Sequence, residues 1–425
     1  MKIYIKQNTI YYNPIFYTLR IIEKNKKIEF DFVDEIEKAD IFWDYDMLNS
    51  QPISINFYNN LNENDSNLAQ SNIFKNKPII YDEKGNEDYI ATIFYMINCL
   101  QEFCISVNDT DNFERFKYSS SYQYRFNNIK ENLVQQFINK LIEKWALNGV
   151  DTPSCFYISH DIDSIYGALK QEGLWALRNK NISKLLYLIL LEIIRKPLWK
   201  NIDKIIKLNS SYDICSTFFW LVNNGIGERG AFNADYFIEK EQNLIKKVEN
   251  SNFYNGLHKS CSKIGITDEF NKVKLNSSSN RYHYLKFLPK NDWGKLSESQ
   301  IELDASLGFA EIYGFRNSYG NAFQPYNIIE KKAYNFISTP LVFMDATLDK
   351  YMKIEIDKIS KTVIEFFENN NNNCIISLLW HNTYLTDFQF EPFLKEYKKI
   401  ILYIYENKIK SISPNEIIEK NKLNW

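Results

Sequence analysis

The chain has 425 residues, of which 45% are hydrophobic and 24% charged, and its formal net charge at pH 7 is -2. This composition is typical of a soluble globular protein with room for two or three domains. Because the chain lacks the excess of basic residues on which nucleic-acid binding depends, we expect no nucleic-acid partner.

The cysteines and the amino terminus indicate the cellular compartment. The six cysteines show no C-x-x-C spacing and several lie in apolar runs, which favours reduced thiols over disulfides or a structural zinc site. Residues 1–6 alternate like a strand and lack the pattern of a signal peptide. We therefore expect a cytoplasmic protein.

Residues 1–130 are predicted to form a small accessory α/β domain that ends in a linker. The region contains no histidine and no compact acidic cluster, so we expect a scaffold or recognition module. Its polar segment 108–128 is the predicted linker. Hydrophobic patterning predicts strands at 3–5, 28–33, 41–43 and 53–57 and helices near 15–22 and 89–103.

Residues 131–425 are predicted to form the catalytic domain. An apolar stripe indicates a helix at 131–147, and Asn148-Gly149 ends it. Beyond it, strand-like runs alternate with helical segments, which indicates a parallel β/α arrangement such as a barrel or part of one. The predicted strands are 155–158, 216–222, 253–258, 282–287, 374–380 and 411–413.

Residues 182–208 combine a strongly apolar stretch, 185–191, with charged residues and Pro197. The stretch is too short to span a bilayer. One interpretation is a buried helix pair that covers the barrel. The other is an interfacial helix in peripheral contact with anionic lipid. The basic residues facing the lipid would be Lys184, Arg195, Lys196, Lys200, Lys204 and Lys207.

The segment Ser159-His160-Asp161-Ile162-Asp163 follows a short apolar run that we interpret as a strand. In a strand, Asp161 and Asp163 lie on one face and His160 on the other. Two carboxylates on one face repel each other unless a metal, a basic partner or a shared proton separates them.

The four histidines of the chain all lie at predicted strand ends or in the turns that follow: His160, His258, His283 and His381. In a parallel sheet the carboxyl ends of the strands converge on one site, where these imidazoles could meet. Imidazole nitrogen and carboxylate oxygen are zinc ligands, and a catalytic site leaves one position for water. An Asp-x-Asp pair could supply one metal ligand and one base beside that water.

These segments resemble motifs of the polysaccharide deacetylase superfamily (NodB-type, carbohydrate esterase family 4), in particular its bacterial branch with an H-D-x-D first motif and an extra amino-terminal domain. The resemblance covers roughly residues 150–425 and implies a distorted (β/α) barrel. The matching segments, in chain order, are 159–163, 216–219, 256–262, 281–284 and 379–381. Asp304 and the segments 314–316 and 343–345 also resemble recurring parts of this branch, without an assigned role.

The resemblance implies roles for individual residues. Asp161 would be the catalytic base, Asp163 and His258 metal ligands, Arg281 the residue that orients Asp161, and His381 the general acid. The metal would be zinc, with cobalt, nickel or manganese as alternatives. His160, Ser262 and Asp304 are accessory candidates.

Two positions depart from the family pattern. Ser262 stands where the second metal histidine is expected, and His283 replaces a proline. A hydroxyl is a weak zinc ligand. If the segment is extended, Arg281 and His283 share a face, and His283 could supply the missing nitrogen. The alternatives are a water in the third position, an inward turn of His160, or a site that no longer binds metal.

The activity implied is hydrolysis of an N-acetyl group on an amino sugar of a nucleotide- or lipid-linked precursor of a surface polysaccharide. One alternative is an amidase or deformylase that acts on another sugar. A second is a degenerate, non-catalytic carbohydrate-binding protein. No obligate protein partner is evident from the sequence.

Overall fold

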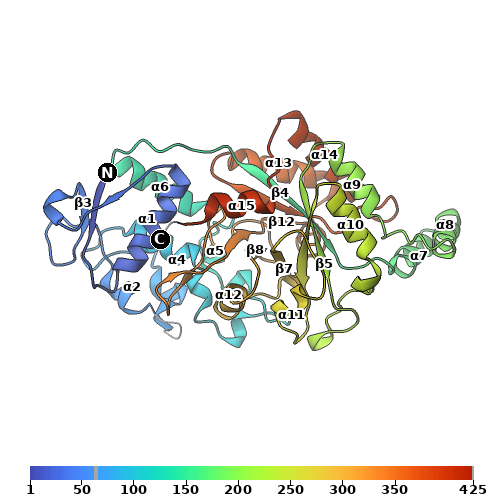
Figure 1. The fold of residues 1–425 in the computed structure, drawn as a ribbon, viewed down its shortest axis with the longest axis horizontal. Helices are drawn as coiled ribbons and strands as arrows, with labels where there is room; N and C mark the ends of the chain where they lie inside the picture. The colour runs from blue at the N-terminus through green and yellow to red at the C-terminus, as the bar shows by residue number, and fades with distance from the viewer. Residues whose placement is uncertain (62–65, 424–425) are drawn as a thin grey trace.

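The computed structural model describes residues 1–61 and 66–423. In Figure 1 the amino-terminal elements occupy one end of an elongated molecule, a large sheet lies in the middle, and a helical hairpin projects from the other end. The described residues include the whole predicted catalytic domain, 131–425, except for residues 424 and 425.

The amino-terminal part contains a three-stranded parallel sheet with the order β2-β1-β3. The predicted strand at 53–57 is wrong, because Ile55–Asn59 forms a short helix that buries Phe57 and Tyr58. The predicted strand at 28–33 shrinks to Asp31–Phe32. The elements are β1 (Lys2–Ile5), α1 (Tyr12–Lys26), β2 (Asp31–Phe32), β3 (Ile41–Trp43), α2 (Ile55–Asn59), α3 (Gln70–Ile73), α4 (Tyr89–Ile97), α5 (Tyr122–Arg125) and α6 (Leu133–Lys144).

The central sheet has eight parallel strands in the order β11-β8-β7-β6-β5-β4-β13-β12. The predicted strands at 216–222, 253–258 and 374–380 correspond to β5, β6 and β13. The strands are β4 (Cys155–Ile162), β5 (Ser216–Leu221), β6 (Tyr254–Lys259), β7 (Ser279–Tyr282), β8 (Leu303–Leu307), β11 (Ile337–Pro340), β12 (Phe343–Met344) and β13 (Ile375–Leu379).

The two edge strands of this sheet, β11 and β12, are separated in the chain by only Leu341 and Val342. Two residues span roughly 10 Å at most, so the sheet must curl until its edges nearly meet. The Ser377 hydroxyl of β13 bridges the gap by donating to the Pro340 carbonyl and accepting from the Val342 amide. The result is an open, curled sheet that approaches a barrel.

The helices of the second part cover this sheet, with two exceptions at the far end, α7 and α8, that project from it (Figure 1). A short antiparallel pair, β9 (Tyr326–Asn327) and β10 (Lys332–Ala333), lies outside the sheet. The helices are α7 (Ala168–Arg178), α8 (Ile182–Ile193), α9 (Ile202–Ser210), α10 (Gln242–Asn250), α11 (Ile266–Phe270), α12 (Pro289–Ser297), α13 (Ile359–Asn369), α14 (Glu391–Glu406) and α15 (Pro414–Asn421).

Two strand predictions in this part are wrong. β7 ends at Tyr282, and residues 283–285 form a turn in which Tyr284 and Leu285 have positive φ angles of 56° and 54°. Residues 411–413 contribute only a single bridge, between Ser411 and Phe156.

The interior of the curled sheet is apolar toward the amino ends of the strands. Tyr157, Phe219, Leu303 and Ile375 form a buried cluster there, and Ile417 of α15 packs into it. Because this end is filled with side chains, the polar residues at the opposite, carboxyl ends of the strands have a rigid support.

The amino-terminal part and the sheet share one continuous hydrophobic core. Glu102 and Arg316 form a fully buried ion pair between them, with 2.9 Å from Nε to Oε1. The predicted linker is packed as well, since Tyr122 and Gln123 are buried and the Gln123 amide donates to the Arg316 carbonyl. The domain boundary at residue 130 stays a prediction.

Among residues 1–61 and 66–423, no helix combines the length and the apolar character needed to cross a membrane.

Candidate metal centre

Three side chains from separate strand ends converge at the carboxyl ends of the strands, beyond the buried cluster that contains Tyr157 and Phe219. Asp163 follows β4, His258 lies on β6, and His283 opens the turn after β7. His258 Nε2 lies 3.0 Å from His283 Nδ1 and 3.3 Å from Asp163 Oδ1. His283 Nδ1 lies 3.6 Å from Asp163 Oδ1. The three atoms therefore form a compact triangle of potential metal ligands.

Backbone carbonyls fix which nitrogen of each imidazole faces the triangle. His258 Nδ1 lies 2.8 Å from the carbonyl oxygen of Arg281, and His283 Nε2 lies 2.8 Å from that of Phe232. Because a carbonyl oxygen only accepts, these are the protonated nitrogens of the neutral rings. With both rings neutral, the lone pairs of His258 Nε2 and His283 Nδ1 face each other, which suits a shared cation. Burial alone would lower the pKa of His258, but the Asp161 and Asp163 carboxylates raise it, so a metal ion would have to displace a proton from protonated His258.

Electrostatics in the triangle favour an ionised carboxylate. Burial alone would raise the pKa of Asp163, but His283, His258 and His381 together hold it far below its usual range. Burial lowers the pKa of His283 to about 4, so this ring is neutral at pH 7. A neutral imidazole and an ionised carboxylate are the forms that bind metal.

Asp161 lies beside the triangle and is held from one side only. Its Oδ1 accepts a hydrogen bond of 2.8 Å from Arg281 Nη1, which also donates to the Ser159 hydroxyl. The guanidinium is fixed in turn by a 3.0 Å bond from Nε to the Ala305 carbonyl and by the Phe219 ring beneath it. Asp161 Oδ2 remains open toward the triangle, 3.4 Å from His258 Nε2.

His381 completes the site from the opposite direction. Its Nε2 lies 3.5 Å from Asp163 Oδ2, while Nδ1 and the backbone amide both contact Asp345, each at 2.6 Å. Burial alone would lower the pKa of His381, but the Asp345 carboxylate raises it to about 9. The ring is therefore a charged donor at neutral pH.

Three accessory candidates from the sequence lie outside this site. The Ser262 hydroxyl hydrogen-bonds to Glu269 and Ser260 instead of facing the triangle. His160 points to the helix side of the sheet, where Nδ1 lies 2.9 Å from the Trp380 carbonyl and Asn209 donates to Nε2. The alternative in which His160 turns inward is therefore wrong, and Ser262, which stands at the motif position of the second metal histidine, does not face the triangle.

Asp304 also faces away from the site. Its carboxylate accepts hydrogen bonds from Asn280 and Ser306, and burial raises its pKa to about 6. It contacts none of the three residues of the triangle in the described structure.

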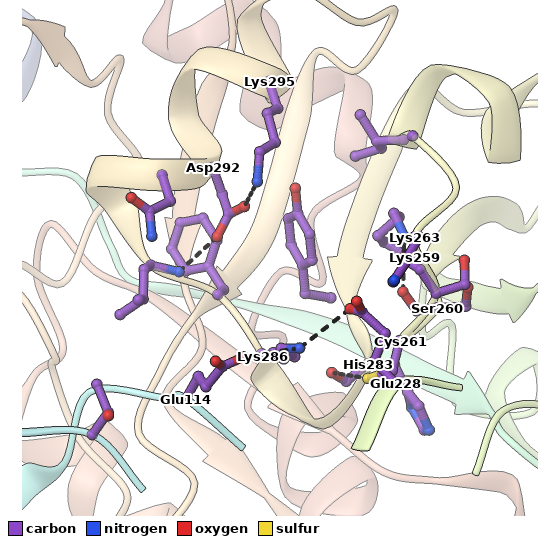
Figure 2. A pocket seen from close by; sticks show the side chains of 18 of the residues that line it. Glu114, Glu228, Lys259, Ser260, Cys261, Lys263, His283, Lys286, Asp292 and Lys295 are labelled. Atoms are coloured by element: carbon purple, nitrogen blue, oxygen red, sulfur yellow. Dashed lines mark hydrogen bonds and ion pairs between the residues drawn. The ribbon is translucent and has the colours of Figure 1, made fainter. Parts of the chain in front are cut away.

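A cavity of about 630 Å³, lined by both apolar and charged side chains, borders the site, with His283 in one wall (Figure 2). Two of its lysines form ion pairs with acids that also line it: Lys286 with Glu114 at 3.2 Å, and Lys295 with Asp292 at 2.8 Å. Because residues 105–114 contribute part of the lining, the region before residue 130 reaches the neighbourhood of the site.

The same amino-terminal region docks onto the turn that carries His283. The Phe113 ring stacks on Tyr284, with 5.0 Å between centroids, and Arg115 Nη1 donates to the Tyr284 carbonyl at 2.9 Å. Arg115 Nη2 also reaches the Tyr351 hydroxyl. This contact could not be predicted from the sequence, because residues 113 and 115 lie in a polar segment that was predicted to be a linker.

Comparison with known proteins gives limited matches. The family model that matches covers residues 1–147 and describes a family of unknown function, DUF7033. A search of the curated proteins found no match.

Several solved structures are similar to this chain. A putative polysaccharide deacetylase from Mycobacterium smegmatis is 10% identical with a TM-score of 0.40, and the match covers 64% of this chain and 93% of that one. A peptidoglycan N-acetylglucosamine deacetylase is 12% identical with a TM-score of 0.32, covering 63% and 90%. The wild-type CE4 family pseudoenzyme from Bacillus anthracis is 10% identical with a TM-score of 0.29, covering 63% and 66%. Identities this low say nothing about individual side chains.

Proposed function

We propose that this protein is a metal-dependent hydrolase that removes an N-acetyl group from an amino sugar. The observation that carries the proposal is the triangle of Asp163, His258 and His283 with Asp161 open beside it. The order of the motifs along the chain, which resembles that of the polysaccharide deacetylases, supports the choice of substrate group.

The donor set fits a zinc-like ion. For ligand bonds of roughly 2.1 Å in a tetrahedral site, adjacent donors are roughly 3.4 Å apart, close to the sides of the triangle. Asp163 Oδ1 is buried and accepts no well-aligned hydrogen bond from the described residues, so its lone pairs are available to a metal ion. Two imidazoles and one carboxylate suit zinc, and cobalt, nickel or manganese are alternatives.

Asp163, His258 and His283 would hold the ion, which would polarise the substrate carbonyl and acidify a water. Asp161 is placed to act as the base. Its Oδ1 is fixed by Arg281, so Oδ2 faces the triangle in one orientation and would take a proton from the attacking water.

His381 is placed to act as the acid. The Asp345 carboxylate keeps the ring protonated at Nδ1 and oriented, so Nε2 can give its proton to the nitrogen of the leaving amine. Asp161 would thus accept a proton and His381 would donate one at the same reaction centre, since Asp161 Oδ2 lies 3.4 Å from His258 Nε2 and His381 Nε2 lies 3.5 Å from Asp163 Oδ2. This division of labour is what amide hydrolysis requires.

The experiment that tests the proposal offers the purified, zinc-loaded chain a panel of N-acetylated amino sugars that are free, nucleotide-linked or lipid-linked. Release of acetate together with a free amine supports it. Release of formate from N-formyl sugars would instead identify a deformylase. Carbohydrate binding without product and without bound metal would identify a non-catalytic binding protein and overturn the proposal.

A further inference from the structure

The α7–α8 hairpin, residues 168–196, exposes an apolar surface that the fold does not explain. Along α8, the residues Ile182, Leu186, Ile189, Leu190 and Ile193 recur at the spacing of one helix face. That face is turned to solvent, with Ile182 67%, Leu186 60% and Ile193 72% exposed. Only Leu188 of α8 is buried. Water-facing apolar stripes of this kind mark contact surfaces.

The hairpin itself is well built, so the exposed face is not a poorly packed region. Leu188 packs with Ala168, Trp199 and Phe388 in a small core of its own. Glu172 of α7, fully buried, accepts hydrogen bonds from the Gln389 amide and the Thr386 hydroxyl. The base is therefore fixed to the barrel, and the hairpin projects beyond it (Figure 1).

The charge of the hairpin differs from that of the chain. Residues 168–196 contain six basic and two acidic side chains, and one of the acids is the buried Glu172, whereas the whole chain has a net charge of -2. Five of the basic residues are exposed, and none of these five forms an ion pair with a described residue. They are Lys170, Arg178, Lys180, Arg195 and Lys196.

We propose that the α7–α8 hairpin docks this protein onto an anionic lipid surface. The apolar face of α8 would lie in the boundary between headgroups and acyl chains, and the basic residues at the turn and after α8 would contact lipid phosphates. Apolar residues and unpaired basic residues on one projection complement a membrane, whereas a protein partner would need acidic groups opposite five separate cations.

The structure narrows the segment expected from the sequence. α9 does not belong to the lipid-facing surface, because Ile202 and Ile205 are buried against the rest of the fold. Lys200 is committed to Glu241 at 2.8 Å. The interpretation of residues 182–208 as a buried helix pair is wrong for α8, and α9 packs only one face, with Ile202 and Ile205, against the fold.

Co-sedimentation of the full chain with vesicles tests the proposal. We expect binding to vesicles that contain phosphatidylglycerol, weaker binding to phosphatidylcholine alone, and weaker binding again in about 0.5 M salt, which screens surface charge. The double variant Leu186→Ser with Ile193→Ser should lower the vesicle partition coefficient by about tenfold or more. The double variant Leu48→Ser with Val107→Ser is the matched control, because these exposed residues lie elsewhere, and it should bind like wild type.

A second pair of variants tests the charge. Arg178→Gln with Lys180→Gln should weaken binding to anionic vesicles only, and Lys24→Gln with Lys27→Gln in α1 and its cap should leave binding unchanged. Absence of vesicle binding, or equal binding by hairpin and control variants, would overturn the proposal. So would a wild-type dimer in lipid-free sedimentation that Leu186→Ser with Ile193→Ser converts to a monomer, because the face would then belong to a second copy. None of these readouts depends on deacetylation.

Discussion

His160 and Asp161 are neighbours on β4, and both are almost completely buried, at 0% and 2% exposure. On the helix side, His160 has a partner for each ring nitrogen, the Trp380 carbonyl and the Asn209 amide. On the interior side, Asp161 has one oxygen held by Arg281 and the other left open to the triangle. A buried polar group whose hydrogen-bonding atoms all have partners stabilises the fold. A buried polar group with one atom left without a hydrogen bond can instead bind a ligand or transfer a proton.

Asp161→Asn should have the largest effect on kcat, because it removes the proposed base on the interior side of β4. The amide can still accept from Arg281, so the fold and the metal content should persist, but it cannot take a proton. We expect kcat to fall by about 10² to 10⁴-fold, the contribution of a positioned base. Turnover is measured as acetate release with metal content determined on the same sample.

Asp304→Asn is the matched control, because Asp304 is a buried sheet carboxylate on the other face. It should leave turnover close to the wild-type value. Near-wild-type turnover by Asp161→Asn would remove the basis for calling Asp161 a base.

His160→Gln tests the structural role of His160 on the helix side of β4, because it should change how the stability of the protein depends on pH. Burial lowers the pKa of His160 from 6.5 to about 4 in the folded state. Between these values the unfolded chain binds the extra proton, so stability falls as pH falls. From pH 6.5 to pH 4 the wild type should lose about 3 kcal/mol of unfolding free energy that His160→Gln does not lose.

Urea denaturation of both proteins at several pH values measures this difference. Turnover of His160→Gln at pH 7 should be close to wild type. If the unfolding free energies of the two proteins changed in parallel with pH, the fold would not lower the pKa of His160, and this prediction would be wrong.

Asp345→Asn should have a smaller effect on kcat than Asp161→Asn. It extends the comparison to a third residue, His381, which has one side fixed by a partner. His381 resembles Asp161, since one side of the ring is held by Asp345 and the other side, Nε2, faces Asp163 of the triangle. Without the carboxylate, the pKa of His381, about 9 in the wild type, should fall. The acid form would then be lost at lower pH, and the alkaline limb of the kcat profile should move down by about 1–3 pH units.

A uniform drop in kcat with an unmoved alkaline limb would show that Asp345 only supports the fold. Titration of the imidazole by NMR in the two proteins gives a reading that does not depend on turnover.

Parts of the architecture were accessible from the sequence because they rest on local patterning. The apolar runs at 216–222 and 374–380 correspond to β5 and β13, and the period of two in β4 separates His160 from Asp161. β11 and β12 were missed, because each has four residues or fewer and pairs with strands distant in the chain. Short, non-local strands leave little periodic signal.

The site was partly accessible for the same reason. Strand-end residues such as Asp163 and His258 follow from parallel topology. The partnership of Asp345 with His381 was missed, because it depends on the register of β12 against β13. The docking of Arg115 on the His283 turn was missed as well, since a polar segment without periodicity says nothing about where it packs.

The zinc content of three proteins, dialysed against the same zinc buffer, tests the three-donor site most directly: wild type, Ser262→Ala and His283→Ala. The structure places His283 Nδ1 at 3.0 Å from His258 Nε2 and turns Ser262 toward Glu269. We therefore expect about one ion per chain in wild type and in Ser262→Ala, and a loss of most of it in His283→Ala, which keeps only two of three ligands. Full zinc in His283→Ala, or loss in Ser262→Ala, would contradict the account.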